Sequence, residues 1–132
     1  MARPPSFPSP ESAVAAFVEA INRGDLDAAI DCYEEGAVLV AQPGLMASGR
    51  DEIREALGGM LSMRPRIVTA SFEVLRSADL ALYHSRWNMA PAGGPDGVEE
   101  REEGCSADVL RRQASGEWKI AIDNPWGTAL LA

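Results

Sequence analysis

The sequence predicts an α+β fold, in which three N-terminal helices cover the concave face of a strongly curved, mostly antiparallel sheet of about six strands. Apolar residues recur at helical spacing in the first half of the chain and alternate in the second half. A length of 132 residues suits one domain with a buried core. Because helices cover only one face, the sheet is expected to curl and to leave a cavity beneath them.

The first expected helix follows a proline-rich segment. Ser9 is placed to cap this helix, and Pro10 suits its first turn. Four prolines among the first ten residues indicate that residues 1–9 form a flexible tail. The inward stripe of the helix consists of Val14, Phe17, Val18 and Ile21.

The end of this helix and the start of a second one meet at residues 24–25. Gly24 suits the left-handed position after a helix, and Asp25 is placed to cap the next helix. The second helix is expected to include Tyr33 and to end before Gly36, because its apolar positions follow helical spacing. These positions are Leu26, Ala29, Ile30 and Tyr33.

Two short strands and a third helix complete the first half. The apolar run 37–41 is rich in β-branched residues, which is typical of a strand. The turn at 42–44 returns the chain into a second short strand at 45–47. The third helix opens at residues 48–51, and its buried side consists of Ile53, Ala56, Leu57, Met60 and Leu61.

Four longer strands are expected at residues 66–76, 80–90, 98–112 and 117–123, with a hairpin loop at 91–97. The strand at 80–90 alternates, so it has two distinct faces. One face carries Leu82, His84, Arg86 and Asn88, and the other carries Tyr83, Ser85, Trp87 and Met89. A turn at 124–127 ends the domain, which is expected to span residues 10–127, with a short tail at 128–132.

Composition argues against several classes of partner. A net charge of −8 repels phosphate backbones, so nucleic-acid binding is not expected. No apolar run approaches the roughly 20 residues that cross a bilayer, and the segment MARPPSFPSP lacks the apolar core of a signal peptide. These features favour a cytoplasmic protein. One histidine and two separated cysteines leave little material for a metal site, and no metal or cofactor is expected.

Three runs of sequence resemble the nuclear transport factor 2-like superfamily. They are Gly-Asp-Leu-Asp at 24–27, Gly-Arg-Asp-Glu-Ile-Arg at 49–54, and DVLRRQASGEWKIAIDNPWG at 108–127. The similarity extends from Glu11 to Gly127 and is nearest to the SnoaL-like and ketosteroid-isomerase-like branch. It implies a cone-shaped sheet, a small-molecule pocket and a homodimer formed through the outer sheet face. Members of this branch include isomerases, cyclases, dehydratases, hydrolases and non-catalytic binding domains.

Ketosteroid isomerases use an aspartate base, a tyrosine and a protonated aspartate. The resemblance places the base at Gln42, just before the Pro-Gly turn, and an amide cannot take a proton. It places the tyrosine at Phe17, which has no hydroxyl, and the protonated aspartate at Asp108. Two of the three functional groups are replaced, so steroid isomerisation by that mechanism is not expected.

Asp108 is the first candidate for chemistry, because it lies between Ala107 and Val109 in a strand that turns apolar. Such a carboxyl group must be exposed, paired or protonated. If the strand register brings Asp123 beside it, the pair provides an acid and a base. The alternative is that Asp108 pairs with an arginine such as Arg86, while Asp123 caps the Asn-Pro turn.

The remaining candidates depend on which face of the sheet is concave. His84 becomes a base if its face is concave, and is otherwise structural or exposed. The Tyr33 hydroxyl is a candidate donor to a ligand carbonyl; the alternative is that Tyr33 packs at the edge of the core. The other candidates are expected to bind substrate; for the three tryptophans among them, the alternative is packing in the core or a dimer interface. They are Trp87, Trp118, Trp126, Phe17, Gln42 and Asn88.

Two functions follow from these features. The first is a pocket protein that binds a small apolar carbonyl-type ligand and carries out isomerase or lyase chemistry, as a cyclase or a dehydratase does. The second is a non-catalytic ligand-binding or dimerisation module, which is consistent with the replacements at Gln42 and Phe17.

Overall fold

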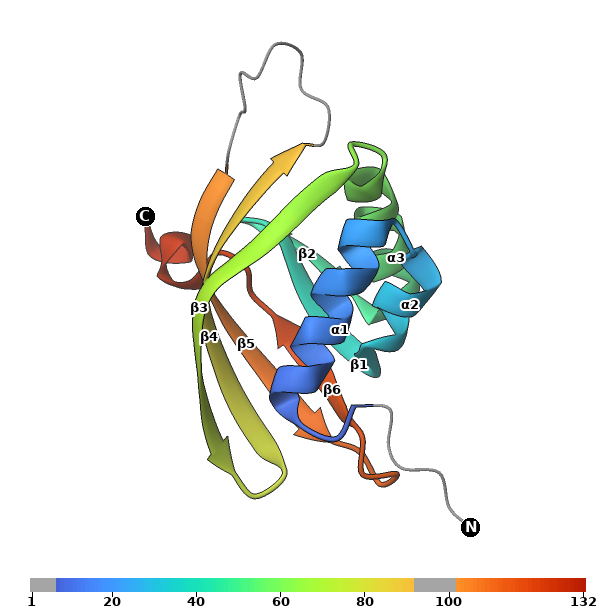
Figure 1. Cartoon of the computed structure of the whole chain (residues 1–132), viewed down its shortest axis with the longest axis vertical. Coiled ribbons are helices and arrows are strands. Elements are labelled where there is room, and N and C mark those ends of the chain that lie inside the picture. Colours follow the sequence, from blue (N-terminus) through green and yellow to red (C-terminus); the bar gives the residue numbers. More distant parts are fainter. Residues whose placement is uncertain (1–6, 92–101) are drawn as a thin grey trace.

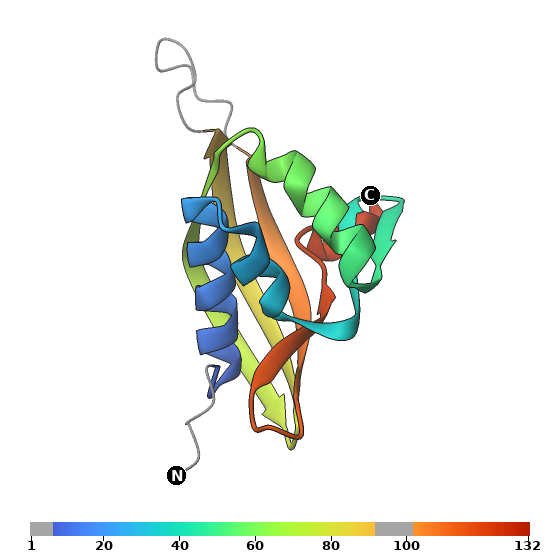
Figure 2. The same ribbon diagram turned by 90° about the vertical axis from the view of Figure 1, so that its right-hand side faces the viewer.

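The computed structural model describes residues 7–91 and 102–132, and within these ranges three α-helices pack against one face of a curved six-stranded sheet (Figures 1 and 2). The helices are α1 (Pro10–Arg23), α2 (Leu26–Asp31) and α3 (Gly49–Leu61). The strands are β1 (Tyr33–Gln42), β2 (Leu45–Ser48), β3 (Pro65–Ser77), β4 (Leu80–Pro91), β5 (Glu102–Arg112) and β6 (Trp118–Asp123). The predicted fold class is confirmed.

The strand order is β2-β1-β6-β5-β4-β3. Neighbouring strands are antiparallel except β1 and β6, which are parallel. The parallel pair joins the N-terminal hairpin to the last strand of the chain. The two halves of the sequence therefore meet in the middle of the sheet, and residues from both halves can face the same interior.

The helix boundaries follow from their caps. Ser9 and Ser12 form a reciprocal capping box, in which the Ser12 N–H donates to Ser9 Oγ at 3.1 Å. Gly24 ends α1 with a φ of +75°, which a glycine adopts without a Cβ clash. The Ala28 N–H then donates to Asp25 Oδ1 at 3.0 Å, so α2 begins at once. The predicted caps are confirmed.

The predicted second helix is too long. It ends at Asp31, and Tyr33 is the first residue of β1. Tyr33 pairs with Ile120 of β6, and the Ile120 N–H donates to the Cys32 carbonyl at 2.8 Å. Pairing with the distant strand leaves Tyr33 with no exposed surface, and this burial outweighs the local helical spacing.

The core occupies part of the space between the helices and the inner sheet face. Its largest fully buried side chains include Trp118, Tyr33, Ile53 and Leu110. The guanidinium of Arg76 lies 4.8 Å from the centroid of the Trp118 ring, in a cation–π contact. Trp118 is therefore a core residue rather than a pocket residue.

The alternation predicted for 80–90 is confirmed by the pairing of β4 with β5. Tyr83 pairs with Asp108 and Ser85 with Ser106 on the inner face. His84 and Arg86 point to the outer face and are exposed. The concave side of the sheet is thus the face of Tyr83, not the face of His84.

Both ends of the described chain differ from the expected tails. Phe7 is buried, and its carbonyl accepts from the Trp118 N–H at 2.9 Å. A 3-10 helix, η2 (Gly127–Leu131), forms where a short tail was expected. Outside the described residues lie 1–6 and 92–101. Part of the predicted tail, most of the predicted hairpin loop and the start of the strand predicted from residue 98 fall in these two ranges. Of the described helices, none has the length and apolarity needed to span a membrane.

Candidate functional site

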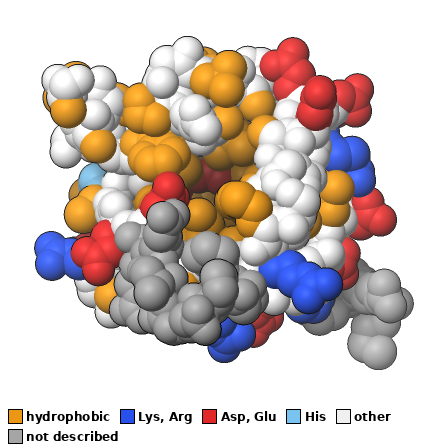
Figure 3. Space-filling view, turned by 90° about the horizontal axis from the view of Figure 1, so that it is seen from above, with side chains coloured by type: hydrophobic (Ala, Val, Ile, Leu, Met, Phe, Trp, Pro, Cys, Tyr) orange, Lys and Arg blue, Asp and Glu red, His pale blue; other side chains and the backbone are white. Residues whose placement is uncertain are grey.

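A cavity of about 500 Å³ lies between the inner sheet face and the helices. Viewed from above, it is a hollow ringed by hydrophobic side chains, with an acidic side chain at its floor (Figure 3). Helix α1 contributes Phe17, β4 contributes Trp87, and the segment after β6 contributes Trp126. Two carboxyl groups, from Asp108 and Asp123, also line the wall.

The register of β5 and β6 brings the two carboxyl groups together. Val109 pairs with Ile122, so Asp108 and Asp123 are the next opposite residues on the inner face. Only 6% of Asp108 and 7% of Asp123 is exposed, and the two side chains are hydrogen-bonded to each other. Two buried carboxyl groups in contact share a proton more readily than they both ionise.

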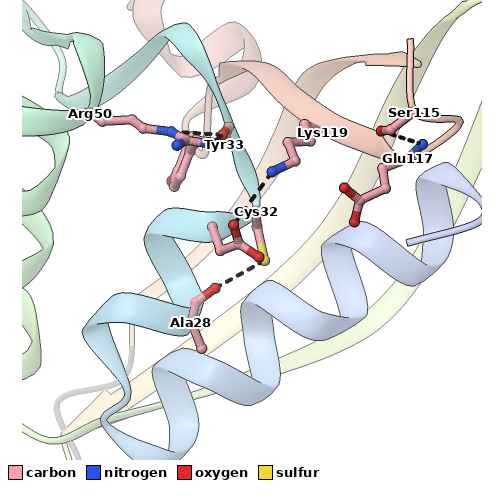
Figure 4. Close-up of polar contacts among 8 residues, drawn as sticks. Ala28, Cys32, Tyr33, Arg50, Ser115, Glu117 and Lys119 are labelled. Carbon is pink, nitrogen blue, oxygen red and sulfur yellow. Dashed lines mark hydrogen bonds and ion pairs between the residues drawn. The ribbon is translucent and has the colours of Figure 1, made fainter. Parts of the chain in front are cut away.

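Each carboxyl group has a further donor. The Tyr33 hydroxyl donates to Asp123 Oδ2 at 2.5 Å, and the Asn124 N–H donates to Asp108 Oδ1 at 2.8 Å. The Tyr33 backbone is held by Arg50, whose Nε donates to the Tyr33 carbonyl at 3.1 Å (Figure 4). Arg50 therefore fixes the backbone of the residue whose hydroxyl donates to Asp123.

These contacts distinguish the two acids. Burial raises the pKa of Asp108 well above 3.8, and the charge and hydrogen bond of Asp123 raise it further. Burial also raises the pKa of Asp123, but the hydrogen bonds from Tyr33 and Asp108 oppose that rise. Burial and the neighbouring Asp123 raise the pKa of Tyr33 well above 10, so Tyr33 remains a donor. The causes that raise the pKa are stronger for Asp108, so when the pair holds one proton, Asp108 is the favoured acid and Asp123 the favoured carboxylate.

The structure contradicts the alternative in which Asp108 pairs with Arg86 and Asp123 caps the turn. Arg86 is exposed on the outer face, opposite Cys105, and does not reach Asp108. Asp108, rather than Asp123, accepts the N–H of Asn124 in the turn. Within the described part of the chain, neither acid forms an ion pair with a lysine or an arginine.

The structure brings some candidates to the cavity and leaves others outside. Phe17, Gln42, Trp87 and Trp126 line it. Tyr33 lies behind Asp123 and reaches the site only through its hydroxyl. His84 and Asn88 are on the outer face by strand alternation, so the structure does not place His84 beside the acids.

Two serines in the cavity wall were not among the predicted site residues. Ser85 and Ser106 face each other across β4 and β5, and their Oγ atoms are 2.6 Å apart. Ser106 also lies near Asp108 and lowers the pKa of Asp108, which opposes the effect of burial. The sequence indicated that Ser85 shares a strand face with Trp87, which is a pocket candidate. Ser106 has no such signal, and only its pairing with Ser85 across β4 and β5 places it in the wall.

The two indole rings form a fixed wall of the cavity. Trp87 Nε1 donates to the Pro125 carbonyl at 2.8 Å, and Trp126 Nε1 donates to the Val40 carbonyl at 2.9 Å. The ring centroids are 6.3 Å apart in an edge-to-face arrangement. Gly104 makes room for Trp87, because a Cβ at that position would lie 2.7 Å from the indole.

The site is chemically suited to proton transfer. It combines two buried carboxyl groups with raised pKa values and a largely apolar enclosure, and burial strengthens electrostatic interactions at such a site. In the described ranges, no group of three His, Cys, Asp or Glu side chains is arranged to hold a metal ion.

A family model described as a SnoaL-like domain matches residues 14–118, which is most of the chain. The chain belongs to the SnoaL-like family. Together with the fold, this match places the protein in the nuclear transport factor 2-like superfamily, as the sequence resemblance predicts. No curated protein sequence matches this SnoaL-like chain.

Solved structures share the fold. A protein of unknown function from Mycobacterium tuberculosis is 23% identical with a TM-score of 0.75, covering 86% of this chain and 66% of that one. A proposed dehydratase of the nuclear transport factor 2-like family from Streptomyces avermitilis is 21% identical with a TM-score of 0.74, covering 86% and 89%. A ketosteroid isomerase-like protein from Erwinia carotovora atroseptica is 27% identical with a TM-score of 0.70, covering 86% and 88%. The SnoaL-like chain is therefore a pocket protein of this superfamily.

Proposed function

We propose that this SnoaL-like protein binds a small apolar carbonyl compound in its cavity and carries out acid–base chemistry on it with Asp108 and Asp123. The observation that supports the proposal is the hydrogen-bonded carboxyl pair in the wall of a mostly apolar cavity. Pairs of titratable groups whose surroundings separate their pKa values are typical of acid–base sites.

The roles follow from the protonation states. Protonated Asp108 donates to the carbonyl oxygen of the ligand, and the Asp123 carboxylate accepts a proton from the adjacent carbon. Tyr33 stabilises the Asp123 carboxylate through its 2.5 Å hydrogen bond. Return of that proton from Asp123 to another carbon is an isomerisation. Departure of a hydroxyl group from the next carbon as water, protonated by the proton that Asp123 accepted, is a dehydration.

This arrangement differs from that of ketosteroid isomerases. Gln42 occupies the position of their base and cannot accept a proton, so Asp123 takes that role from β6. The names of two structural neighbours, an isomerase-like protein and a proposed dehydratase, are consistent with proton transfer on a carbonyl compound.

A substrate screen with matched variants tests the proposal. Native mass spectrometry of the freshly purified protein first identifies any retained small molecule, which guides the choice of carbonyl substrates. Asp108→Asn keeps the shape of the side chain but removes the transferable proton, so turnover is expected to be lost while the melting temperature changes little. Asp51→Asn, which removes an exposed carboxylate from α3, is the control. Full turnover in Asp108→Asn would exclude Asp108 from the mechanism.

A dimerisation role has a separate observation in its favour. Four large apolar side chains of the outer sheet face are between 45% and 56% exposed, and an exposed apolar face is typical of an interface. They are Val68, Leu75, Leu80 and Ile122. We expect a homodimer through this face, and light scattering at micromolar concentration tests it. Leu75→Glu is expected to give monomers, and a monomeric parent protein would contradict the proposal.

A further inference from the structure

The charge of the cavity wall is entirely acidic among the described lining residues. Asp108 and Asp123 lie together on the inner face, and Glu102 lines the cavity six residues before Asp108 on β5. Six strand residues span roughly 20 Å, so the acidic groups are well separated along the cavity. No lysine or arginine is among the described residues of this wall.

Among the described residues, the hydrogen-bond donors to the Asp123 carboxyl group are neutral. Its hydrogen bonds come from the Tyr33 hydroxyl and the Asp108 carboxyl group. No cation of the described chain pairs with it. A negative charge that is buried with hydrogen bonds but without a counter-ion attracts a cation and repels an anion more strongly than an exposed charge does.

The apolar part of the wall also suits a cation. Phe17, Trp87 and Trp126 line the cavity, and the two indoles are held in place by hydrogen bonds to backbone carbonyls. The negative face of an aromatic ring attracts an organic cation, and tryptophan does so most strongly. Aromatic rings beside a carboxylate provide both an apolar surface and a counter-ion for an ammonium group.

We propose that this cavity selects its ligand by charge: it binds an apolar molecule bearing a protonated amine more tightly than the neutral molecule of the same skeleton, and it excludes the carboxylate. The ammonium group lies at the Asp108–Asp123 pair, and the apolar skeleton lies against Trp87 and Trp126. This inference rests on the proposed function only in that the same cavity binds a small molecule.

Three probes with one skeleton test the selection. They are 2-naphthylmethylamine, 2-naphthylmethanol and 2-naphthoate, which are cationic, neutral and anionic at pH 7. Isothermal titration calorimetry of the full chain is expected to give a Kd for the amine roughly tenfold below that of the alcohol, and a Kd for the carboxylate at least roughly tenfold above it. The amine and the alcohol are expected to compete for one site.

Two variants relate the ranking to the buried charge. Asp123→Asn removes the charge, so the Kd values of the amine and the alcohol are expected to become equal. Asp51→Asn removes an exposed carboxylate elsewhere and is expected to preserve the ranking. The ranking in the parent protein tests the proposal even if Asp123→Asn fails to fold.

The outcomes separate this inference from the proposed function. Equal binding of all three probes, or tightest binding of the carboxylate, overturns charge selection and leaves the carbonyl-ligand proposal standing. Tight binding of the amine with no binding of the alcohol supports charge selection and contradicts a neutral ligand. Binding of none of the probes contradicts both.

Discussion

The inner and outer faces of β4 and β5 share one backbone but differ in chemistry. On the inner face, Ser106 and Asp108 are buried, and burial raises the pKa of Asp108. On the outer face, His84, Arg86 and Cys105 are exposed. Side-chain type alone does not separate the faces, because each face carries polar and ionisable side chains. Burial beneath the helices makes the inner face a candidate site.

The two cysteines give the largest expected contrast between inside and outside. Cys32 is buried, and burial raises the pKa of its thiol to about 12, whereas Cys105 is exposed. Because the thiolate is the reactive form, alkylation of Cys32 by iodoacetamide at pH 8 is expected to be roughly a thousandfold slower than that of an ordinary exposed thiol. Mass spectrometry of the alkylated protein measures both rates. Cys105→Ser is the control and should leave only the slow site; equal rates would contradict the assigned burial.

Leucines on the two faces give the next contrast. Leu110 has no exposed surface, while Leu75 is 56% exposed on the outer face. Leu110→Ala is expected to lower the free energy of unfolding by about 2–5 kcal/mol, because it leaves a cavity in the core. Leu75→Ala is expected to cost less than about 1 kcal/mol in the monomer. Urea unfolding measures both costs, and similar values would show that the outer face is as well packed as the core.

Tyr33→Phe tests the hydrogen bond behind the acid pair. The variant removes the hydroxyl that donates to Asp123 Oδ2, so a buried carboxylate loses a donor. The expected loss of unfolding free energy is about 1–3 kcal/mol. Tyr83→Phe is the matched control, since it keeps the ring that stacks on Phe72. A cost for Tyr33→Phe no larger than that of the control would argue against an ionised Asp123.

The pH dependence of stability tests the effect of burial on one inner-face carboxyl group. Burial raises the pKa of Asp108 in the folded protein well above 3.8, the value for the unfolded chain, so the folded protein holds this proton to a higher pH. The contribution of Asp108 is therefore full below pH 3.8 and declines as pH rises towards the folded pKa, by at most about 1.4 kcal/mol per pH unit. Asp108→Asn cannot titrate, so its stability relative to the parent is expected to improve as pH rises.

Urea unfolding at about pH 4, 5.5 and 7 measures this difference, with Asp51→Asn as the control for a lost surface charge. A stability difference between parent and Asp108→Asn that does not change with pH would show that Asp108 is already ionised in the folded protein.

Much of the fold was predictable because its signals are local. Ser9, Gly24 and Asp25 act within one turn of the backbone, and the structure uses each of them as a helix boundary. Alternation along β4 likewise depends only on the geometry of one strand. Asp108 was identifiable as a candidate because an acid within an apolar run requires an explanation.

The remaining site features depend on distant parts of the chain. Tyr33 has helical spacing, but its pairing with Ile120 across the sheet makes it a strand residue. Ser106 has no local signal, and it joins the site only because β4 and β5 align it with Ser85. Alternation placed His84 and Tyr83 on opposite faces without indicating which face the helices cover.

The sequence by itself determined the α+β class, the caps, the alternation of β4 and the choice of Asp108, because each is encoded within a few neighbouring residues. Only the tertiary structure decided that Asp123 lies beside Asp108, that Tyr33 donates to it, and that His84 faces outward. Strand register and the curvature of the sheet result from packing among residues far apart in the chain, and that packing determines which side chains are buried.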